Sequence, residues 1–385
     1  MRGSRLVPNV AWPKGVRPIV WPEGPGGGTE TFLSGFFEDI AMTHRILLTL
    51  IALALVLSVG APPASAAQFR PLLADTSRDT DPAPSPDGRW LAYQSNKGGS
   101  SQIWIVPTGG GAPRKLTSEP ATTKSPDGKA IPTRVMTPTW APDSKSLLYI
   151  STRSGGYNIY SIPLAGGTPK ALSKAAGAQR YPVYSPDGTK IVFPSSRNQP
   201  GSLWGFQLYV MGAKCEVNGP PARQLTRSNG SPGHPIWSPD GKWVCYVAKD
   251  IDTTRTVNIG GGMQAKQSAM FSSFRVFKIP AAGGREVKLT GIRTDPGQAE
   301  DTWPAWSPDG KWIAFGRNIQ GKSNLWVLDV LSGHAFPITE LGNAMKPNWS
   351  PDGKSLYFTR LDEKQNEDIW VATNLDLVSN ARAKR

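Results

Sequence analysis

The sequence Ser-Pro-Asp-Gly at residues 85–88 decides the fold, because the same turn returns along most of the chain. Pro sets φ at the first corner of a tight turn, Asp can hydrogen-bond to its own backbone, and Gly accepts a positive φ. Further copies stand at 185–188, 238–241, 307–310 and 350–353, and the variant Ala-Pro-Asp-Ser stands at 141–144. The chain therefore repeats one unit six times.

Three short apolar segments that are typical of strands follow each turn. The fifth copy shows them clearly, as Trp312-Ile313-Ala314-Phe315, Leu325-Trp326-Val327-Leu328 and Pro337-Ile338-Thr339. Together with the segment before the turn, each copy supplies four strands. The shortest spacings between turn prolines match the roughly 40–45 residues of a four-stranded propeller blade, and longer spacings add loops. Six such units fit a ring, so the sequence predicts an all-β, six-bladed β-propeller of four-stranded antiparallel blades.

The last copy lacks its third apolar segment, and a matching segment lies at the other end of the repeat region. Residues 376–385 contain no counterpart of Pro337-Ile338-Thr339, whereas Phe69-Arg70-Pro71-Leu72-Leu73 precedes the first copy. We therefore predict that 69–73 pairs as the outermost strand of blade 6 and closes the ring, which removes an open sheet edge.

The motifs also resemble those of a known family. The pattern Trp-Ser-Pro-Asp-Gly-Lys, then Ile-Ala-Phe, then Leu-Trp-Val, then an apolar residue and Thr, is similar to the WD-like repeat of the TolB family of bacterial propellers. The resemblance covers residues 69–373. It implies a TolB-like propeller that binds protein partners in the cell envelope, such as a lipoprotein. The blades begin soon after the N-terminal apolar segment, so the N-terminal α/β domain of TolB is not expected here.

The N-terminal region predicts export. Residues 46–59 form an apolar run, with His44 and Arg45 before it and Ala64-Ser65-Ala66 after it, which is the pattern of a signal peptide. The run is shorter than the about 20 residues of an ordinary membrane-spanning helix. We predict a signal peptide at 42–66 that is cleaved near Ala66, a periplasmic or secreted propeller at 67–385 with no membrane span, and a disordered extension or misassigned start at 1–41. An uncleaved anchor is the alternative.

The charge of the chain favours anionic partners, since its formal net charge is +14. Acidic protein surfaces, including that of an envelope lipoprotein, and anionic glycans fit this charge. Nucleic acid is not expected as a partner of an exported chain whose basic residues are scattered. General solubility is the alternative reason for the charge, and a single propeller of this kind is expected to be a monomer.

The two cysteines, Cys215 and Cys245, leave two possibilities open. Export permits a disulfide between them. However, Cys245 occupies the strand position that Ala92 and Ala314 fill in other copies, which is typical of a small buried hydrophobe.

Each copy has a proline shortly before its turn, and the residue that directly precedes this proline differs in every copy. These residues are Asp81, Thr137, Tyr181, His234, Trp303 and Lys346. Unlike side chains at equivalent positions of otherwise similar units are typical of a binding ring around a channel mouth, although a solvated rim would vary as freely. Three long insertions, at 118–136, 195–206 and 250–273, are expected on the same face, opposite the turns. We expect a loop at 118–136, despite its extra Ser-Pro-Asp-Gly, and a binding site at the channel mouth formed by Arg180, Tyr181, His234, Asp301, Trp303 and Lys346.

The residue types do not predict catalysis, a metal or a cofactor. The Gly-x-Ser-x-Gly motif of a peptidase domain is missing, and the only histidines after residue 66, His234 and His334, are expected on opposite faces. The predicted function is that of an exported, non-enzymatic protein-binding or scaffold module of the cell envelope. The alternative is a small propeller lyase or hydrolase that acts on an anionic oligosaccharide in the channel.

Overall fold

The computed structural model describes most of the chain after residue 66. The described residues are 67–73, 75–125, 127–174, 177–199, 205–214, 221–250, 255–258, 264–267, 273–291, 299–375 and 377. No helix in these ranges is long and apolar enough to cross a membrane. Residues 1–66 and Cys215 lie outside the described residues, so the signal peptide, the N-terminal extension and the disulfide remain predictions.

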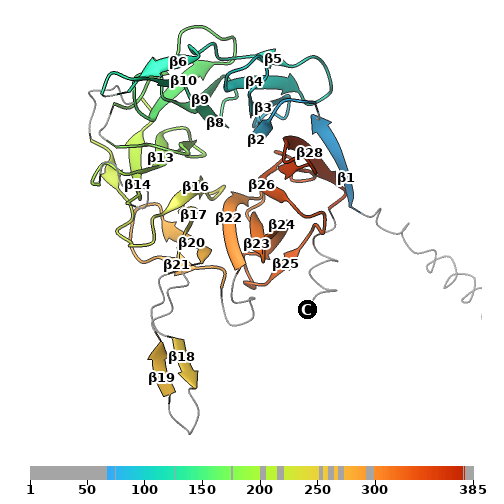
Figure 1. Ribbon diagram of the computed structural model, residues 1–385. Coiled ribbons are helices and arrows are strands. Elements are labelled where there is room, and N and C mark those ends of the chain that lie inside the picture. Colours follow the sequence, from blue (N-terminus) through green and yellow to red (C-terminus); the bar gives the residue numbers. More distant parts are fainter. Residues whose placement is uncertain are drawn as a thin grey trace, which may run out of the picture. The chain divides into compact units, whose positions relative to one another are not determined.

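Six four-stranded antiparallel sheets form a ring (Figure 1). In chain order, the blades are β2 (Asp79–Pro84), β3 (Trp90–Ser95), β4 (Gln102–Pro107) and β5 (Arg114–Lys115); β8 (Val135–Trp140), β9 (Ser146–Ser151), β10 (Asn158–Pro163) and β11 (Lys170–Ala171); β12 (Val183–Tyr184), β13 (Lys190–Ser195), β14 (Gln207–Gly212) and β15 (Arg223–Gln224); β16 (Gly233–Trp237), β17 (Trp243–Lys249), β20 (Phe274–Pro280) and β21 (Val287–Lys288); β22 (Ala299–Trp306), β23 (Trp312–Ile319), β24 (Lys322–Asp329) and β25 (Ala335–Pro337); and β26 (Ala344–Trp349), β27 (Leu356–Leu361), β28 (Glu367–Thr373) and β1 (Gln68–Leu73). The predicted six-bladed propeller is confirmed.

Strand β1 closes the ring as predicted. It pairs antiparallel with β28, so that Phe69 lies opposite Ala372 and Pro71 lies opposite Trp370. Its last residues, Leu72 and Leu73, pack against a buried cluster that includes Leu91 of the first blade. The N-terminal strand therefore completes blade 6 and also contacts blade 1.

The Ser-Pro-Asp-Gly turns join the first and second strands of the blades. In the first copy, Ser85 donates its hydroxyl to Asp87 at 2.6 Å, and Gly88 has a φ of 73°. A Cβ built on Gly88 would lie 3.4 Å from Cγ of Pro351 in the turn of blade 6. The repeated glycine thus permits the positive φ and also leaves room for the turn of the neighbouring blade, and the turns gather on one face.

The core lies between blades and along their middle strands. Opposed aromatic residues on the second and third strands stack, as Tyr149 does on Tyr160 with ring centroids 5.8 Å apart. The same two rings join a buried cluster with Ala92 and Ile105 of the preceding blade, so these aromatic residues pack between blades. Cys245 is fully buried in another cluster, as expected of a small hydrophobe, and burial raises the pKa of its thiol.

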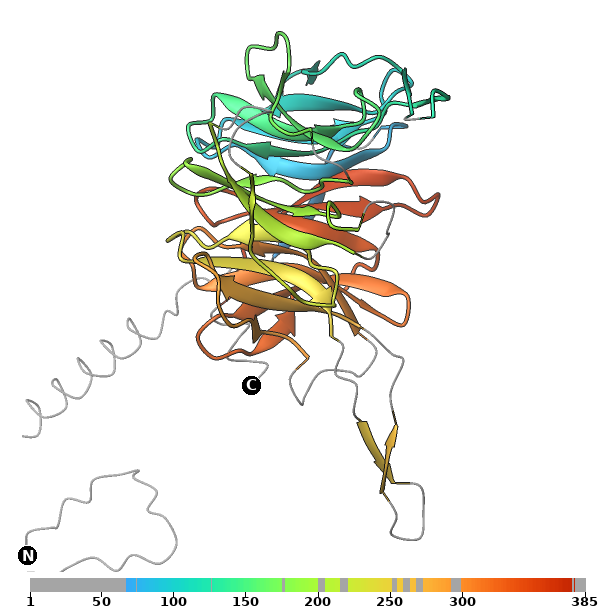
Figure 2. The ribbon, with the colours of Figure 1, turned by 90° about the vertical axis from the view of Figure 1, so that its left-hand side faces the viewer.

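Two insertions form small sheets of their own. Strands β6 (Thr122–Lys124) and β7 (Ala130–Pro132) pair in one hairpin, and β18 (Arg255–Asn258) and β19 (Gln264–Gln267) pair in another (Figure 2). The sequence predicted only a loop at the first site. The extra Ser-Pro-Asp-Gly still makes its turn, with Gly128 donating to the carbonyl of Ser125 at 2.9 Å, but the flanking residues are too exposed to build a blade.

Candidate functional site in the central channel

Six residues, one from each blade, share an unusual backbone conformation at the channel. Each lies four positions before the first residue of its turn and directly before a proline. Their φ angles lie between 43° and 55°, in the left-handed region, and they are Asp81, Thr137, Tyr181, His234, Trp303 and Lys346. A positive φ is an outlier for β-branched and bulky residues. We call these six residues the channel ring.

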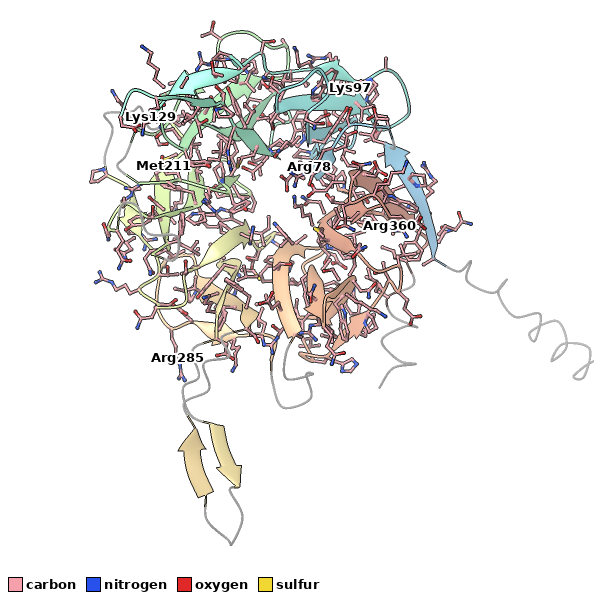
Figure 3. The ribbon with its side chains drawn as sticks, viewed as in Figure 1. Arg78, Lys97, Lys129, Met211, Arg285 and Arg360 are labelled. Atoms are coloured by element: carbon pink, nitrogen blue, oxygen red, sulfur yellow. The ribbon has the colours of Figure 1, made fainter. Side chains whose placement is uncertain are left out.

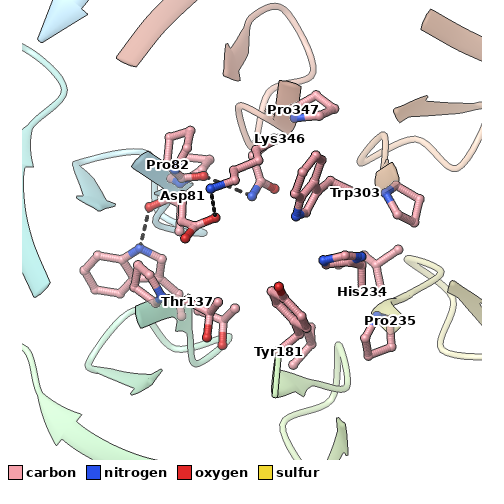
Figure 4. A pocket seen from close by; sticks show the side chains of 18 of the residues that line it. Asp81, Pro82, Thr137, Tyr181, His234, Pro235, Trp303, Lys346 and Pro347 are labelled. Carbon is pink, nitrogen blue, oxygen red and sulfur yellow. Dashed lines mark hydrogen bonds and ion pairs between the residues drawn. The ribbon is translucent and has the colours of Figure 1, made fainter. Parts of the chain in front are cut away.

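The prolines explain why the innermost strands change register at the channel ring. Proline has no N–H to donate to a ladder and is confined to sheet edges and bulges. Pairing is accordingly interrupted between Thr80 and Ala83 in blade 1 and between Thr302 and Ala305 in blade 5. Bulges of this kind re-aim side chains. Figure 4 shows the ring side chains converging from separate blades on the centre of the channel.

A cavity of about 260 Å³ lies against the channel ring. All six ring residues and the prolines that follow Asp81, Thr137, His234, Trp303 and Lys346 line it. Pro84 and Pro86 also contribute to its wall, so the cavity extends from the ring towards the Ser-Pro-Asp-Gly turns. Most of the walls are therefore apolar, and the polar groups come from the ring and from Thr139 and Asn348.

One half of the ring is aromatic. The ring centroids of Tyr181 and His234 lie 4.1 Å apart, and those of His234 and Trp303 lie 5.2 Å apart. Burial, together with the nearby charges of Lys346 and Arg180, lowers the pKa of His234 to about 3. The imidazole is therefore neutral at ordinary pH, with one donor and one acceptor nitrogen. Neither of its nitrogens has a hydrogen-bond partner among the described residues, and the indole N–H of Trp303 has none there either.

The other half of the ring is polar and internally paired. Nζ of Lys346 lies 3.2 Å from Oδ1 of Asp81, 2.6 Å from Oγ1 of Thr80 and 5.5 Å from the ring centre of Trp303. It also lies 3.6 Å from Glu367, which in turn pairs with Arg78 beside the channel (Figure 3). Lys346 therefore ties blade 6 to blade 1, and its charge is balanced by carboxylates.

Thr137 lies between the two halves of the ring. Its side chain is 8% exposed, and within the described part of the chain its hydroxyl has no hydrogen-bond partner. A buried hydroxyl without a partner costs free energy. Like the nitrogens of His234, this group is available to a molecule that enters the cavity.

The predicted site is only partly assembled. Tyr181, His234, Trp303 and Lys346 lie together, with Asp81 and Thr137 completing their ring. Arg180 lies beside a second cavity of about 210 Å³, which shares Tyr181 and His234 with the first. Asp301 does not reach either cavity.

Asp301 of blade 5 is buried against blade 4. It lies opposite Arg317 in the β22–β23 ladder, and Nε of Arg317 is 2.6 Å from Oδ1 of Asp301. Thr290 donates its hydroxyl to Oδ2 of Asp301 at 2.5 Å, and Asp301 and Arg317 are both fully buried. The register shift between Thr302 and Ala305 separates this carboxylate from the channel ring, and the sequence interpretation did not take that shift into account.

The left-handed backbone of the ring was missed by the sequence interpretation, although a signal for it was present. A proline inside a strand is compatible only with an edge or a bulge, and here it recurs at one fixed distance from every turn. The ring can offer aromatic surface, neutral hydrogen-bonding groups and a compensated ion pair. No group of three His, Cys, Asp or Glu side chains within the described ranges is placed to hold a metal ion.

Comparison with known proteins agrees with this architecture. The family model of the TolB beta propeller domain matches residues 131–253. An uncharacterized protein of Agrobacterium fabrum is 29% identical over 237 residues, which are 60% of this chain and 68% of that protein. A TolB homolog of Chlorobium chlorochromatii is 30% identical over 116 residues, or 30% of this chain and 23% of that protein.

A solved structure shows the same fold. The crystal structure of TolB from Acinetobacter baumannii aligns with a TM-score of 0.52 and 22% identity, covering 72% of this chain and 58% of that one. The likeness at this identity is one of fold, and it agrees with the propeller architecture. The chain is a six-bladed β-propeller, and its residues 131–253 are similar to the TolB beta propeller domain.

Proposed function

We propose that this propeller is an exported, non-enzymatic binding module of the cell envelope, which holds a protein partner at its channel. The observation that carries the proposal is the channel ring. Six unlike side chains stand on six equivalent left-handed X-Pro bulges, and polar atoms of three of them have no partner among the described residues. Backbone strain of this kind costs about 1–3 kcal/mol per residue and clusters at functional sites.

The chemistry of the ring suits a protein segment. Trp and Tyr are common anchors of protein interfaces, because they combine large apolar area with a polar tip. Trp303, His234 and Tyr181 form a continuous aromatic wall, and the adjacent cavity could receive a side chain of the partner. An acidic protein surface or lipoprotein would also match the net charge of +14.

The described residues give the enzymatic alternative less support. Asp301 is locked to Arg317, Asp81 is paired with Lys346, and His234 has no carboxylate partner to orient it as a general base. An anionic oligosaccharide therefore remains a possible ligand of the channel rather than the favoured substrate.

Capture from an envelope extract tests the proposal. The wild-type protein is compared with the double variant Trp303→Ala/Lys346→Ala and with a control that reverses charge at the exposed turn residues, Lys242→Glu/Lys311→Glu. We expect the ring variant to lose a partner that wild type and control retain, at a melting temperature that shows it to be folded. Loss of the partner by the control alone would refute binding at the ring, and turnover of polyuronates by wild type would favour the enzymatic alternative.

Export is tested separately by N-terminal sequencing of the mature protein. The signal-peptide pattern at 42–66 predicts a first residue at Ala67. A mature protein that retains residues 46–59 would indicate an anchor instead.

A further inference from the structure

The guanidinium of Arg180 lies beside the channel, and its charge has no partner among the described residues. Its guanidinium lies 5.0 Å from the ring centre of Phe206 and 5.6 Å from that of Tyr157, so it stacks on aromatic side chains. The backbone N–H of Arg180 donates to the carbonyl of Pro194, but the guanidinium makes no hydrogen bond or ion pair with any described residue. Its five N–H donors are therefore available.

Two other arginines that stack on aromatic residues pair with carboxylates, whereas Arg114, Arg197 and Arg360 stack without an ion pair to any described residue. Arg153 lies 5.7 Å from the ring of Tyr160 and 3.3 Å from Glu119. Arg317 lies 4.6 Å from the ring of Trp326 and 2.6 Å from Asp301. Arg180 resembles Arg153 and Arg317 in its stacking, but no carboxylate of the described residues pairs with it, and it lines a cavity.

The second cavity, which Arg180 lines, has a volume of about 210 Å³ and is mainly apolar. Pro194, Phe206, Pro232, Val247 and Phe274 supply its apolar wall, Ser231 and Thr302 add hydroxyl groups, and the described lining contains no Asp or Glu. Tyr181 and His234 line this cavity and the ring cavity alike, so they form the wall between the two. Figure 4 shows the Tyr181 side chain pointing into the centre of the ring.

A cavity with this lining selects an anion that also carries an apolar group. A guanidinium binds a carboxylate through two parallel N–H···O bonds, and charge-assisted bonds of this type are roughly twice as strong as neutral ones. The apolar wall favours burial of hydrocarbon or an aromatic ring. Sites for drug-sized ligands occupy about 300–1,000 Å³, so a cavity of about 210 Å³ suits a group of about one amino-acid residue.

We propose that the Arg180 cavity binds a carboxylate attached to an apolar or aromatic group of about one residue in size. Two sources share this chemistry: the C-terminal residue of a polypeptide, and a free small carboxylic acid. This inference rests on the proposed function, because both assign binding to the channel. It adds that the bound molecule presents a carboxylate to Arg180.

Isothermal titration calorimetry of the purified protein tests this assignment with four probes. They are N-acetyl-phenylalanine, its amide, acetate, and the pentapeptide Ser-Gly-Ser-Gly-Phe with a free C-terminus. We expect N-acetyl-phenylalanine to bind at least about tenfold more tightly than its amide, because a hydrogen bond to a charged group contributes more than a neutral one. We also expect it to bind more tightly than acetate, which lacks the apolar group.

Two matched variants place the binding at Arg180. Arg180→Gln should abolish the preference for acid over amide. Arg197→Gln should keep it, because Arg197 stacks on Phe193 and Tyr209 of the same blade but does not line the cavity. Thermal melting confirms that both variants are folded before their affinities are compared.

The outcomes separate the possibilities. Equal binding of acid and amide, absence of binding, or a preference that survives Arg180→Gln would overturn the assignment. If the pentapeptide binds as N-acetyl-phenylalanine does, the ligand is a chain end, and if only the small acid binds, it is a free acid. If the ring variant still captures the envelope partner while the acid binds at Arg180, binding of the partner at the ring is refuted and this site stays in place.

Discussion

The left-handed backbone of the channel ring makes a prediction about glycine at Thr137. Thr137 has a φ of 55°, whereas Thr139, two positions later in the same strand, has no positive φ. An L-residue other than glycine is disfavoured in the left-handed region by about 1–2 kcal/mol. Glycine escapes that cost but loses more conformational freedom on folding, by about 0.5–1 kcal/mol relative to alanine.

Comparing glycine with alanine at each position isolates this backbone effect, because both substitutions remove the threonine hydroxyl and methyl groups. At position 137, glycine should be the more stable of the two by about 0.5–1 kcal/mol, since relief of the left-handed strain exceeds the entropic loss. At position 139, glycine should be the less stable by about 0.5–1 kcal/mol. The difference changes sign between two positions of one strand.

Thermal melting of the four variants Thr137→Gly, Thr137→Ala, Thr139→Gly and Thr139→Ala is the assay. A difference of about 1 kcal/mol moves Tm by about 2–4 °C in domains of 150–250 residues, and by somewhat less in a larger one. Both Thr139 variants should also fall below wild type, because the Thr139 hydroxyl donates to the carbonyl of Pro182 at 2.6 Å. If glycine is less stable than alanine by the same amount at both positions, the argument from backbone strain is refuted.

Three further predictions concern the scaffold. Deletion of residues 67–73 should lower Tm sharply, because it removes β1 from β28 and exposes the buried cluster that includes Leu91. An unchanged Tm would contradict closure of the ring by β1. Asp301→Ala should destabilise the protein by about 3–5 kcal/mol in chemical denaturation, because it removes one partner of a buried ion pair with Arg317, and a loss below about 1 kcal/mol would contradict this. Burial raises the pKa of Asp79 to about 6, so the stability contributed by its protonated carboxyl group is present below about pH 4 and is lost as pH rises through 6. The free energy of unfolding of wild type should therefore fall more between pH 4 and pH 7 than that of Asp79→Asn. Parallel pH curves for the two proteins would contradict this.

Sequence reasoning predicted the fold well because each blade repeats the same local chemistry. The turn residues and the apolar runs predict the hairpins, and six consistent copies reinforce each other. The closing strand was predictable for the same reason, since Phe69-Arg70-Pro71-Leu72-Leu73 supplies the strand that blade 6 lacks.

The candidate site was less predictable because it depends on side-chain direction. Trp303 and Asp301 lie two positions apart, and a regular strand would place both on one face. The bulge at Trp303-Pro304 interrupts that alternation, so Trp303 reaches the channel while Asp301 stays in register with Arg317 and is buried against blade 4. A list of nearby charged and aromatic residues could not separate the two, because the separation comes from the register shift.

The same shift shows how one repeated scaffold supports a variable site. The proline that follows each ring residue interrupts the ladder in the same way in every blade, whatever side chain precedes it. Asp81, Thr137, Tyr181, His234, Trp303 and Lys346 can therefore differ without changing the turns or the packing between blades. Substitution at the ring should accordingly alter binding more than folding, with one exception. Lys346 also joins blade 6 to blade 1 through Asp81 and Thr80, so its loss should affect both.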